Sequence, residues 1–436
     1  MSVDISSLPI GIKMPKNVDQ SALKRASTAC FIGNFVEWFD YASYGFLATI
    51  IAVSFFPTYD KTSGLMAAFA IFALSFLVRP LGGIFWGHIG DKIGRKTALS
   101  ASIIIMSCAT FCIGFLPDYH SIGIWAPILL LVARMFQGFS ASGEYAGAAT
   151  FLTEFAPKQQ KGFYASIVPA SAAAGLLFGS VFVSGLYAFL STTQLHEWGW
   201  RVPFLLAAPF GLIGLYIRMQ LEDSPQFVKF KQDSKAEQAP IPIKILFKEH
   251  KRTLLLGFII TSLNAVGFYL LLSYMPTYMT VQLQIKETTA FSISSVVLIC
   301  YIFFVFGVGK LSDVFGRKKL LMLASFSFMC LSIPIFSILE SASIIQITLV
   351  LILFSACLAL NDGCLSCYLC ELFPTKVRYS GFALSFNSAN ALFGGTAPFI
   401  ATTLISVTGL SIAPGLYIMF ISTITLTVMV ATYKHH

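Results

Sequence analysis

Charged side chains are scarce in this chain of 436 residues, since Asp, Glu, Lys and Arg together make up 11% while apolar residues make up 56%. The mean hydropathy is +0.77. A water-soluble domain carries roughly a quarter of charged residues. The shortage of charge therefore excludes a soluble globular protein and indicates a polytopic membrane protein.

Signatures of enzymes and channels are also missing. The chain has no His-Glu-x-x-His, Gly-x-Ser-x-Gly or phosphate-binding Gly-Lys-Ser/Thr motif, and nothing in it resembles a selectivity filter. The nine cysteines lie almost entirely inside apolar stretches, which argues against a disulfide framework. Cys364, Cys367 and Cys370 have no nearby His in the sequence. We therefore expect no catalytic residues, no metal site and no cofactor.

Twelve apolar runs are long enough to cross a hydrocarbon layer of about 30 Å as helices. All are expected to be helical, because an open sheet edge in lipid would leave backbone groups unpaired. The expected fold class is an all-α membrane protein with twelve transmembrane helices. The runs lie at residues 26–54, 63–86, 97–116, 123–152, 163–190, 200–220, 252–280, 288–310, 320–339, 342–371, 379–408 and 411–433.

A motif of the form G-x-x-x-D-x-x-G-R-K occurs twice, beginning at Gly87 and at Gly309. A second pair of landmarks, Glu154-Phe-Ala-Pro157 and Glu371-Leu-Phe-Pro374, lies at nearly the same offset. The chain therefore reads as two pseudo-symmetric six-helix bundles, an architecture typical of transporters that work by alternating access. The expected organisation is an N-terminal segment 1–25, a bundle 26–220, a linker 221–251, a bundle 252–433 and a C-terminal segment 434–436.

Lys and Arg are distributed unevenly among the loops. Most of the 29 fall in the N-terminal segment, the even-numbered turns and the linker. The positive-inside rule then predicts that both termini and both motif copies face the cytoplasm. This topology accounts for the net charge of +9 without a nucleic-acid partner. Residues 1–25 are polar and basic and lack a short apolar core with a cleavage site, so we expect no cleaved signal peptide.

The repeated segments carry acidic and basic residues on that same face. We predict that Arg95 pairs with Glu154 and that Arg317 pairs with Glu371, closing the cytoplasmic side in one state and releasing it in another. The alternative is that these residues only anchor the topology and lie at the surface. The predicted gating residues are Asp91, Arg95, Glu154, Asp313, Arg317 and Glu371.

A few ionisable residues fall inside the spans, where an unpaired charge costs at least about 2.5 kcal/mol. We predict that Asp40 or Glu37 carries a proton, with Glu144 serving either as a relay or as part of a packing network. Arg134 is then either the counter-ion of that carboxylate or the group that binds a substrate carboxylate. A permanent Asp40–Arg134 pair that only positions two helices is the alternative. Arg79 is expected to extend towards the inner interface.

Polar and aromatic side chains on the same helix faces complete the candidate site. The expected partners are a small-molecule substrate, protons and the lipid bilayer, with the chain acting as a monomer. The predicted substrate-binding residues are Asn34, Tyr41, Tyr44, Arg134, Gln137, Asn264, Tyr274, Asn361 and Asn387.

The doubled motif resembles the loop signature of the major facilitator superfamily. Its metabolite:proton symporter branch is similar in Gly33-Asn34-Phe-Val-Glu37-Trp38-Phe39-Asp40, in Arg79-Pro-Leu-Gly-Gly and in Phe373-Pro374-Thr-x-Val-Arg378-Tyr. Within that branch, Leu271-Leu-x-Tyr274-Met-Pro276 resembles the bacterial proline/glycine betaine transporters. The resemblance implies a symporter, driven by the proton gradient, that imports a zwitterionic osmolyte across the bacterial inner membrane. Arg134 stands where organic-acid relatives carry arginine, so a dicarboxylate, a tricarboxylate or a related anion is the alternative substrate.

Overall fold

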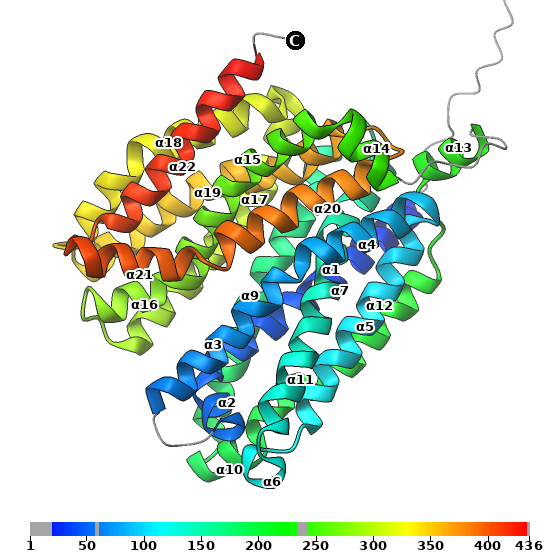
Figure 1. The fold of residues 1–436 in the computed structure, drawn as a ribbon. Helices are drawn as coiled ribbons and strands as arrows, with labels where there is room; N and C mark the ends of the chain where they lie inside the picture. The colour runs from blue at the N-terminus through cyan, green and yellow to red at the C-terminus, as the bar shows by residue number, and fades with distance from the viewer. Residues whose placement is uncertain (1–19, 57–60, 234–241, 434–436) are drawn as a thin grey trace, which may run out of the picture.

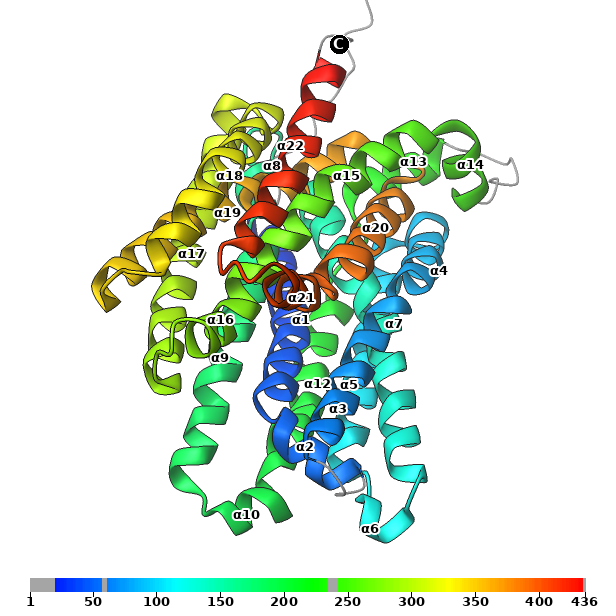
Figure 2. The same ribbon diagram turned by 60° about the vertical axis from the view of Figure 1, so that its left-hand side comes forward.

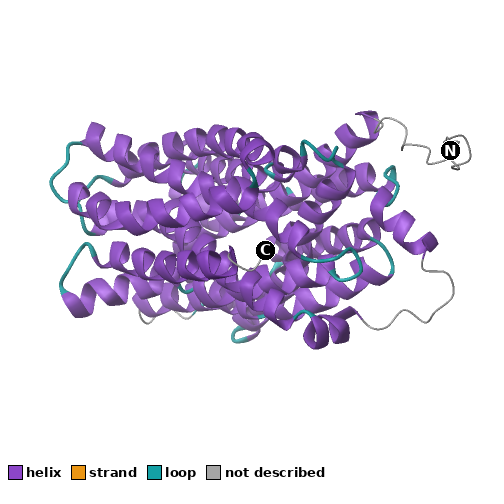
Figure 3. Ribbon diagram, turned by 90° about the horizontal axis from the view of Figure 1, so that it is seen from above, coloured by secondary structure: helices purple, strands orange, loops and turns teal. Residues whose placement is uncertain are grey.

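The structure is a computed structural model that describes residues 20–56, 61–233 and 242–433. These residues are predominantly helical, and none of them forms a strand (Figure 1, Figure 3). The expected all-α fold class is confirmed. The cytoplasmic placement expected for residues 1–19 and 434–436 concerns segments outside the described ranges.

The first half of the chain forms six spans, four of which contain consecutive helices separated by one residue. The interruption at Val78 precedes Pro80, whose ring removes a backbone N–H from the helix. The spans are α1 (Gln20–Phe46) with α2 (Ala48–Phe55), α3 (Lys61–Leu77) with α4 (Arg79–Lys92), α5 (Arg95–Phe115), α7 (Trp125–Phe155), α8 (Lys161–Ala165) with α9 (Ile167–Phe189), and η2 (Gly199–Arg201) with α11 (Val202–Leu205) and α12 (Ala207–Met219).

The second half also forms six spans, two of which contain a π-helical turn, η3 and η4. The helix that follows each of them has a proline as its second residue, Pro276 or Pro398, which cannot donate the usual helical hydrogen bond. The spans are α15 (Lys251–Phe268) with η3 (Tyr269–Tyr274) and α16 (Met275–Val281), α17 (Glu287–Phe315), α18 (Arg317–Leu339), α19 (Ile344–Leu372), α20 (Arg378–Ala389) with η4 (Asn390–Gly394) and α21 (Ala397–Thr408), and α22 (Ala413–Tyr433).

Ten helical segments of the described chain are long and apolar enough to cross a membrane. The two other spans of the twelve-helix fold are α1 with α2, and α7. Each carries two or more buried ionisable side chains, which lower its hydropathy. These two spans are therefore less apolar than the other ten because they hold charged side chains in the interior. The side chains are Glu37, Asp40, Arg134, Glu144 and Glu154.

Short helices mark the two ends of the molecule. The linker between the halves contains α13 (Pro225–Asp233) and α14 (Pro242–Glu249), which lie at the same end as the turn between α4 and α5 (Figure 1, Figure 2). We call this end, which carries both copies of the repeated motif, the motif end. The opposite end carries α2, α6 (Tyr119–Ile122) and α10 (Thr192–Glu197).

The two halves meet along α4 and α20 and along α17 with α8 and α9. Motif glycines allow both crossings, because a side chain would not fit. A Cβ added at Gly87 would lie 2.5 Å from Ser380 Cα, and one added at Gly309 would lie 2.6 Å from Ser166 Cβ. The glycine before the arginine of the second copy, Gly316, has a φ of 88° and starts α18 in a conformation that glycine favours.

Candidate functional site

The first buried ion pair joins α1 to α4. Arg79 Nη2 lies 2.7 Å from Glu37 Oε1 and donates a hydrogen bond of 2.6 Å to the Tyr41 hydroxyl. The side chains of Arg79 and Glu37 are each 2% exposed. The expectation that Arg79 extends towards the interface is therefore wrong. A carboxylate on the neighbouring helix balances the guanidinium, so the arginine does not need to reach water.

The second pair joins α1 to α7. Arg134 Nη1 lies 2.9 Å from Asp40 Oδ2, and Gln137 Nε2 donates a hydrogen bond of 3.1 Å to the same oxygen. The Arg134 guanidinium stands over the ring of Tyr44, 3.7 Å from its centroid, in a cation–π contact. Four residues chosen from the sequence thus lie together, and Arg134 is the counter-ion of Asp40 in this state.

Asn34 and Glu144 bond to residues outside these two pairs, at helix contacts of the first half. Asn34 Nδ2 donates hydrogen bonds to the Val168 carbonyl at 2.7 Å and to Ser171 Oγ at 2.9 Å. Glu144 forms a buried ion pair with Arg218 of α12. Both sets of contacts are those of helix packing.

The second half contains one buried carboxylate cluster. Asn264 Nδ2 donates a hydrogen bond of 2.8 Å to Asp362, and the Tyr301 hydroxyl donates to the other oxygen. Asp362 is 1% exposed, and no described basic side chain forms an ion pair with it. The amide of neighbouring Asn361 is buried without a hydrogen-bond partner among the described residues. This half thus adds a negative group to the interior without a balancing arginine.

The other two residues expected from the second half make separate contacts. The Tyr274 hydroxyl accepts a hydrogen bond of 3.2 Å from Thr402. Asn387 Nδ2 donates at 2.8 Å to the backbone carbonyl of Ser142, which belongs to the first half. Asn387 therefore helps to hold the halves together in this state.

At the motif end, Asp91 of α4 accepts hydrogen bonds from the backbone N–H groups of Tyr379 at 3.1 Å and of Ser380 at 2.8 Å. These groups belong to the first turn of α20, where unpaired N–H groups favour an anion. Asp91 also lies 3.2 Å from Arg95. The motif aspartate of the first half thus caps a helix of the second half.

Glu154 is shared by partners from several segments. It lies 3.3 Å from Arg95, as expected from the sequence, and 2.7 Å from Arg378 of the second half. Ser224 of the linker donates a hydrogen bond to it, and Arg95 donates one of 2.8 Å to the Thr375 carbonyl. Glu154 therefore connects the first half, the linker and the second half in one buried network.

In the second motif copy the aspartate again binds backbone N–H groups of the other half, but here the aspartate belongs to the second half. Asp313 of α17 accepts hydrogen bonds from the backbone N–H groups of Gly162 at 2.8 Å and Phe163 at 3.0 Å, in the first half. Arg317 lies 2.8 Å from Asp313 and 3.4 Å from Glu371, as the sequence predicts. The Glu371 side chain is 41% exposed, so this second pair is far less enclosed than the Arg95–Glu154 pair.

Several residues of these networks were missed by sequence reasoning. Arg378 can be recognised in the sequence as part of the repeat, but its partner Glu154 lies in the other half and could not be predicted. Asn361 was predicted as a site residue, but its neighbour Asp362 was not. Arg218 lies near the end of the sixth span, where a positive side chain is ordinary and does not by itself indicate a buried ion pair. The residues added by the structure are Arg79, Arg218, Ser224, Tyr301, Asp362 and Arg378.

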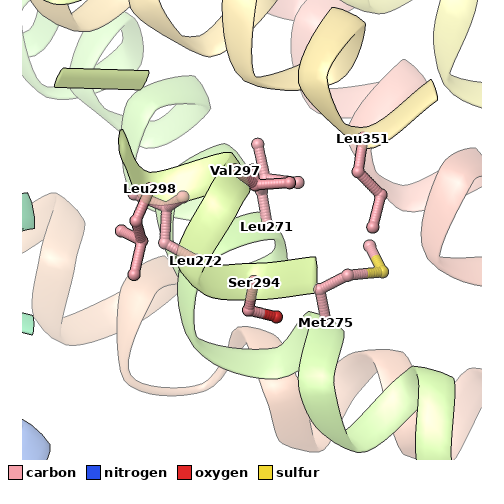
Figure 4. Close-up of a pocket in the computed structure, with 7 residues that line it drawn as sticks. All are labelled: Leu271, Leu272, Met275, Ser294, Val297, Leu298 and Leu351. Carbon is pink, nitrogen blue, oxygen red and sulfur yellow. The ribbon is translucent and has the colours of Figure 1, made fainter. Parts of the chain in front are cut away.

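The structure also shows a narrow apolar crevice between η3, α17 and α19 (Figure 4). Its lining includes Leu271, Met275, Val297 and Leu351, with Ser294 as the polar member. None of the predicted site residues lines it. Within the described part of the chain, no group of three or more His, Cys, Asp and Glu residues is placed to hold a metal ion.

Two six-helix halves, with buried Arg–carboxylate pairs inside and reciprocal caps at one end, define a multi-pass membrane transporter. Residues 26–240 match the profile of the sugar (and other) transporter family, and residues 257–435 match that of the major facilitator superfamily. The chain belongs to the major facilitator superfamily.

Curated relatives cover most of the chain. A proline/betaine transporter of Salmonella typhimurium is 39% identical over 94% of this chain and 83% of its own length. A glycine betaine/proline/ectoine/pipecolic acid transporter of Dickeya dadantii is 38% identical over 96% of this chain and 85% of its own length. These relatives are transporters and not enzymes.

Among solved structures, the proton:xylose symporter XylE bound to 6-bromo-6-deoxy-D-glucose aligns with a TM-score of 0.79. The alignment covers 95% of this chain and 96% of that chain at 16% sequence identity. It confirms the twelve-helix fold expected from the sequence.

Proposed function

We infer that the chain is a proton-coupled symporter that imports a zwitterionic osmolyte such as proline or glycine betaine by alternating access. The family and the relatives support transport, and the names of the relatives support this class of substrate. The orientation proposed is that of a bacterial inner-membrane protein with the motif end in the cytoplasm. Action as a monomer remains a prediction.

The charge balance of the interior is the observation that favours a zwitterionic substrate over an organic acid. Arg79 is balanced by Glu37, Arg134 is balanced by Asp40, and the second half adds only the carboxylate Asp362. A site without excess positive charge favours a substrate with no net charge over a dianion, whose desolvation would not be compensated. This observation argues for a zwitterion against the organic-acid alternative.

The contacts at the motif end support alternating access. Asp91 and Asp313 each bind backbone N–H groups of the opposite half, and Glu154 binds Arg378 across the same boundary. Separation of the halves at this end would break all of these contacts together. The described state therefore corresponds to a transporter that is closed at the motif end.

Positive side chains support the proposed orientation. The turns of the motif end are rich in lysine, as is typical of cytoplasmic loops. They include Lys92, Lys96, Lys158, Lys161, Lys318 and Lys319.

Uptake into proteoliposomes tests this function. With an acidic outer solution, the purified protein is expected to accumulate radiolabelled proline or glycine betaine above the outer concentration, and a protonophore should abolish the accumulation. Saturable proton-driven uptake of neither compound would contradict the proposal. Inhibition by excess succinate or citrate, with uptake of those acids, would favour the organic-acid alternative.

A further inference from the structure

Five aromatic side chains gather where the two halves meet beside the Arg79–Glu37 pair. We call this group the aromatic box, which consists of Trp38, Tyr41, Phe76, Phe268 and Tyr269. The rings of Trp38 and Phe268 lie 4.9 Å apart between centroids, and those of Phe76 and Tyr269 lie 5.6 Å apart. Trp38 also contacts Tyr41 at 5.7 Å and Tyr269 at 6.2 Å. The first three residues belong to the first half and the last two to the second.

Arg79 contacts two rings of the aromatic box. The Arg79 guanidinium carbon lies 4.6 Å from the centroid of the Phe76 ring and 5.1 Å from that of Tyr41. A carboxylate-binding group and several π faces are therefore adjacent. Zwitterions with a short link between carboxylate and ammonium need this combination, because quaternary ammonium groups bind to aromatic faces.

Four polar atoms around the box are buried and make no hydrogen bond to any residue the structure describes. They are Glu37 Oε2, Trp38 Nε1, Arg79 Nε and the Tyr269 hydroxyl. Each of these residues is at most 6% exposed. Buried polar atoms without partners are uncommon in native proteins. The Arg134–Asp40 pair also has four such atoms, Asp40 Oδ1, Arg134 Nε, Arg134 Nη2 and Gln137 Oε1, so both places offer bonds to a ligand and the surrounding rings distinguish them.

We propose that Arg79 binds the carboxylate of the zwitterion while the aromatic box holds its N-alkylated ammonium group between rings of both halves. This assignment rests on the proposed function and specifies its binding site. In the described state the rings of the two halves are in direct contact. The substrate therefore enters when α1 and α15 are farther apart, and the rings close on it.

Substrate binding at Arg79 also provides a route for coupling. The substrate carboxylate replaces Glu37 at the guanidinium, and Glu37 then takes one proton from solution on a carboxylate oxygen. A buried carboxylate that has lost its arginine is costly to keep ionised, so proton uptake follows from the displacement. The balance is one proton and one zwitterion bound for each Arg79–Glu37 contact broken.

Arg134 is less suited to this role. The rings in contact with its guanidinium, Tyr44 and Phe204, both belong to the first half. The rings in contact with Arg79 also belong to the first half, but the box extends from them to Phe268 and Tyr269 of the second half. Movement between the halves therefore opens the box beside Arg79, whereas the rings beside Arg134 move together with it.

The number of N-methyl groups on the ligand tests the box. Binding of glycine, sarcosine, N,N-dimethylglycine and glycine betaine to the purified protein is measured by thermal shift and by competition with labelled glycine betaine. In the wild type, affinity should increase with each methyl group. Trp38→Leu and Tyr269→Leu should weaken glycine betaine binding by roughly tenfold or more and remove most of the methyl dependence. Trp38→Phe and Tyr269→Phe keep an aromatic ring and should retain the dependence of affinity on the number of methyl groups.

A matched control is Phe386→Leu, which removes a ring at the boundary between the halves that stacks on Tyr145 outside the box. This variant should keep the wild-type methyl dependence. Variants that keep a cooperative thermal transition are compared, so loss of folding is separated from loss of binding. Equal affinity of the wild type for all four ligands, or an unchanged methyl dependence in both leucine variants, would overturn the aromatic box. Proton-driven betaine uptake with such a result would leave the proposed function standing.

Arg79→Lys tests the coupling step. The ammonium cannot bind a carboxylate in the two-pronged manner of a guanidinium. Betaine affinity should fall at least about tenfold, while the preference among the four methylated ligands remains. Glu37→Gln should keep betaine binding but lose the uptake of protons that accompanies it, measured with a pH indicator in weak buffer. Proton uptake equal to that of the wild type in Glu37→Gln would contradict the role of Glu37.

Discussion

Asp91 and Ser380 lie in different halves of the chain, and the Asp91 carboxylate accepts the backbone N–H of Ser380 at 2.8 Å. Asp313 accepts the backbone N–H of Gly162 at the same distance, with the roles of the halves exchanged. The duplicated motif thus provides two reciprocal caps. Each aspartate completes the first turn of a helix that its own half does not contain.

Asp91→Asn should favour opening at the motif end, because the neutral amide interacts more weakly with the start of α20 and with Arg95. We expect labelling of Cys370 by N-ethylmaleimide to accelerate by roughly fivefold or more, from a contribution of about 1–2 kcal/mol. Cys370 is buried and faces Thr150 across the boundary between the halves. The measurement requires replacement of the other eight of the nine cysteines.

The control for this variant is Asp118→Asn, which changes an acidic residue in an exposed turn at the opposite end. The Asp118 carboxylate accepts hydrogen bonds from Ser121, which lower its pKa, and both bonds lie within its own turn. Labelling of Cys370 should be unchanged. Equal labelling rates in Asp91→Asn and the wild type would show that the cap does not hold the motif end closed.

Glu154→Gln and Glu371→Gln should have unequal effects despite their equivalent places in the repeat. Glu154 is buried between two arginines, whereas Glu371 is 41% exposed and pairs with Arg317 of its own half. Breaking a buried pair costs roughly 3–5 kcal/mol, while an exposed pair contributes about 0–1 kcal/mol. Cys370 labelling should therefore rise much more in Glu154→Gln. Similar changes in both variants would argue against this asymmetry.

Gly309→Ala should hinder closure at the motif end. The added Cβ would lie 2.9 Å from the Gly162 carbonyl oxygen and 2.6 Å from Ser166 Cβ, so α17 and α8 would have to separate. Gly307→Ala, two residues earlier on the same helix, meets no atom within 4 Å and serves as the control. Uptake should fall at least about tenfold in the first variant and change little in the second. Comparable uptake in both would contradict the tight crossing.

Asp40→Asn should destabilise the protein, because Arg134 would remain buried without a counter-charge. The expected loss is roughly 3–5 kcal/mol, and Asp40→Asn combined with Arg134→Gln should recover most of it. Thermal unfolding of the two single variants and the double variant, followed by intrinsic fluorescence, gives the comparison. Additive losses would show that the two charges do not depend on each other.

The number of spans, their approximate bounds and the duplication follow from the sequence, because a bilayer imposes the length and composition of a helix. The pairs Arg95–Glu154 and Arg317–Glu371 were also predictable, since each joins landmarks at the ends of neighbouring spans. Their role in gating remains a prediction.

Contacts that depend on how helices rotate and cross were not predictable. Arg79 could extend to the interface or turn inward, and only the position of Glu37 on α1 decides between these outcomes. Asp362 can be recognised in the sequence as a carboxylate within a span. Its partner Tyr301 lies on another helix, α17, and the sequence does not show that the two side chains meet. Contacts between the halves, such as Arg378 with Glu154, depend on the conformational state and leave no local signal in the sequence.

The neutral Arg79–Glu37 and Arg134–Asp40 pairs have a consequence for the electrical behaviour of the transport cycle. In the empty protein these four side chains contribute no net charge, so the membrane potential exerts little force on them during the return step. The loaded protein carries one additional positive charge, and a potential of 100 mV contributes about 2.3 kcal/mol to its movement. The charge of Asp362 is present in both steps, so the two steps together should move one positive charge inward for each zwitterion, and uptake should produce an inward current.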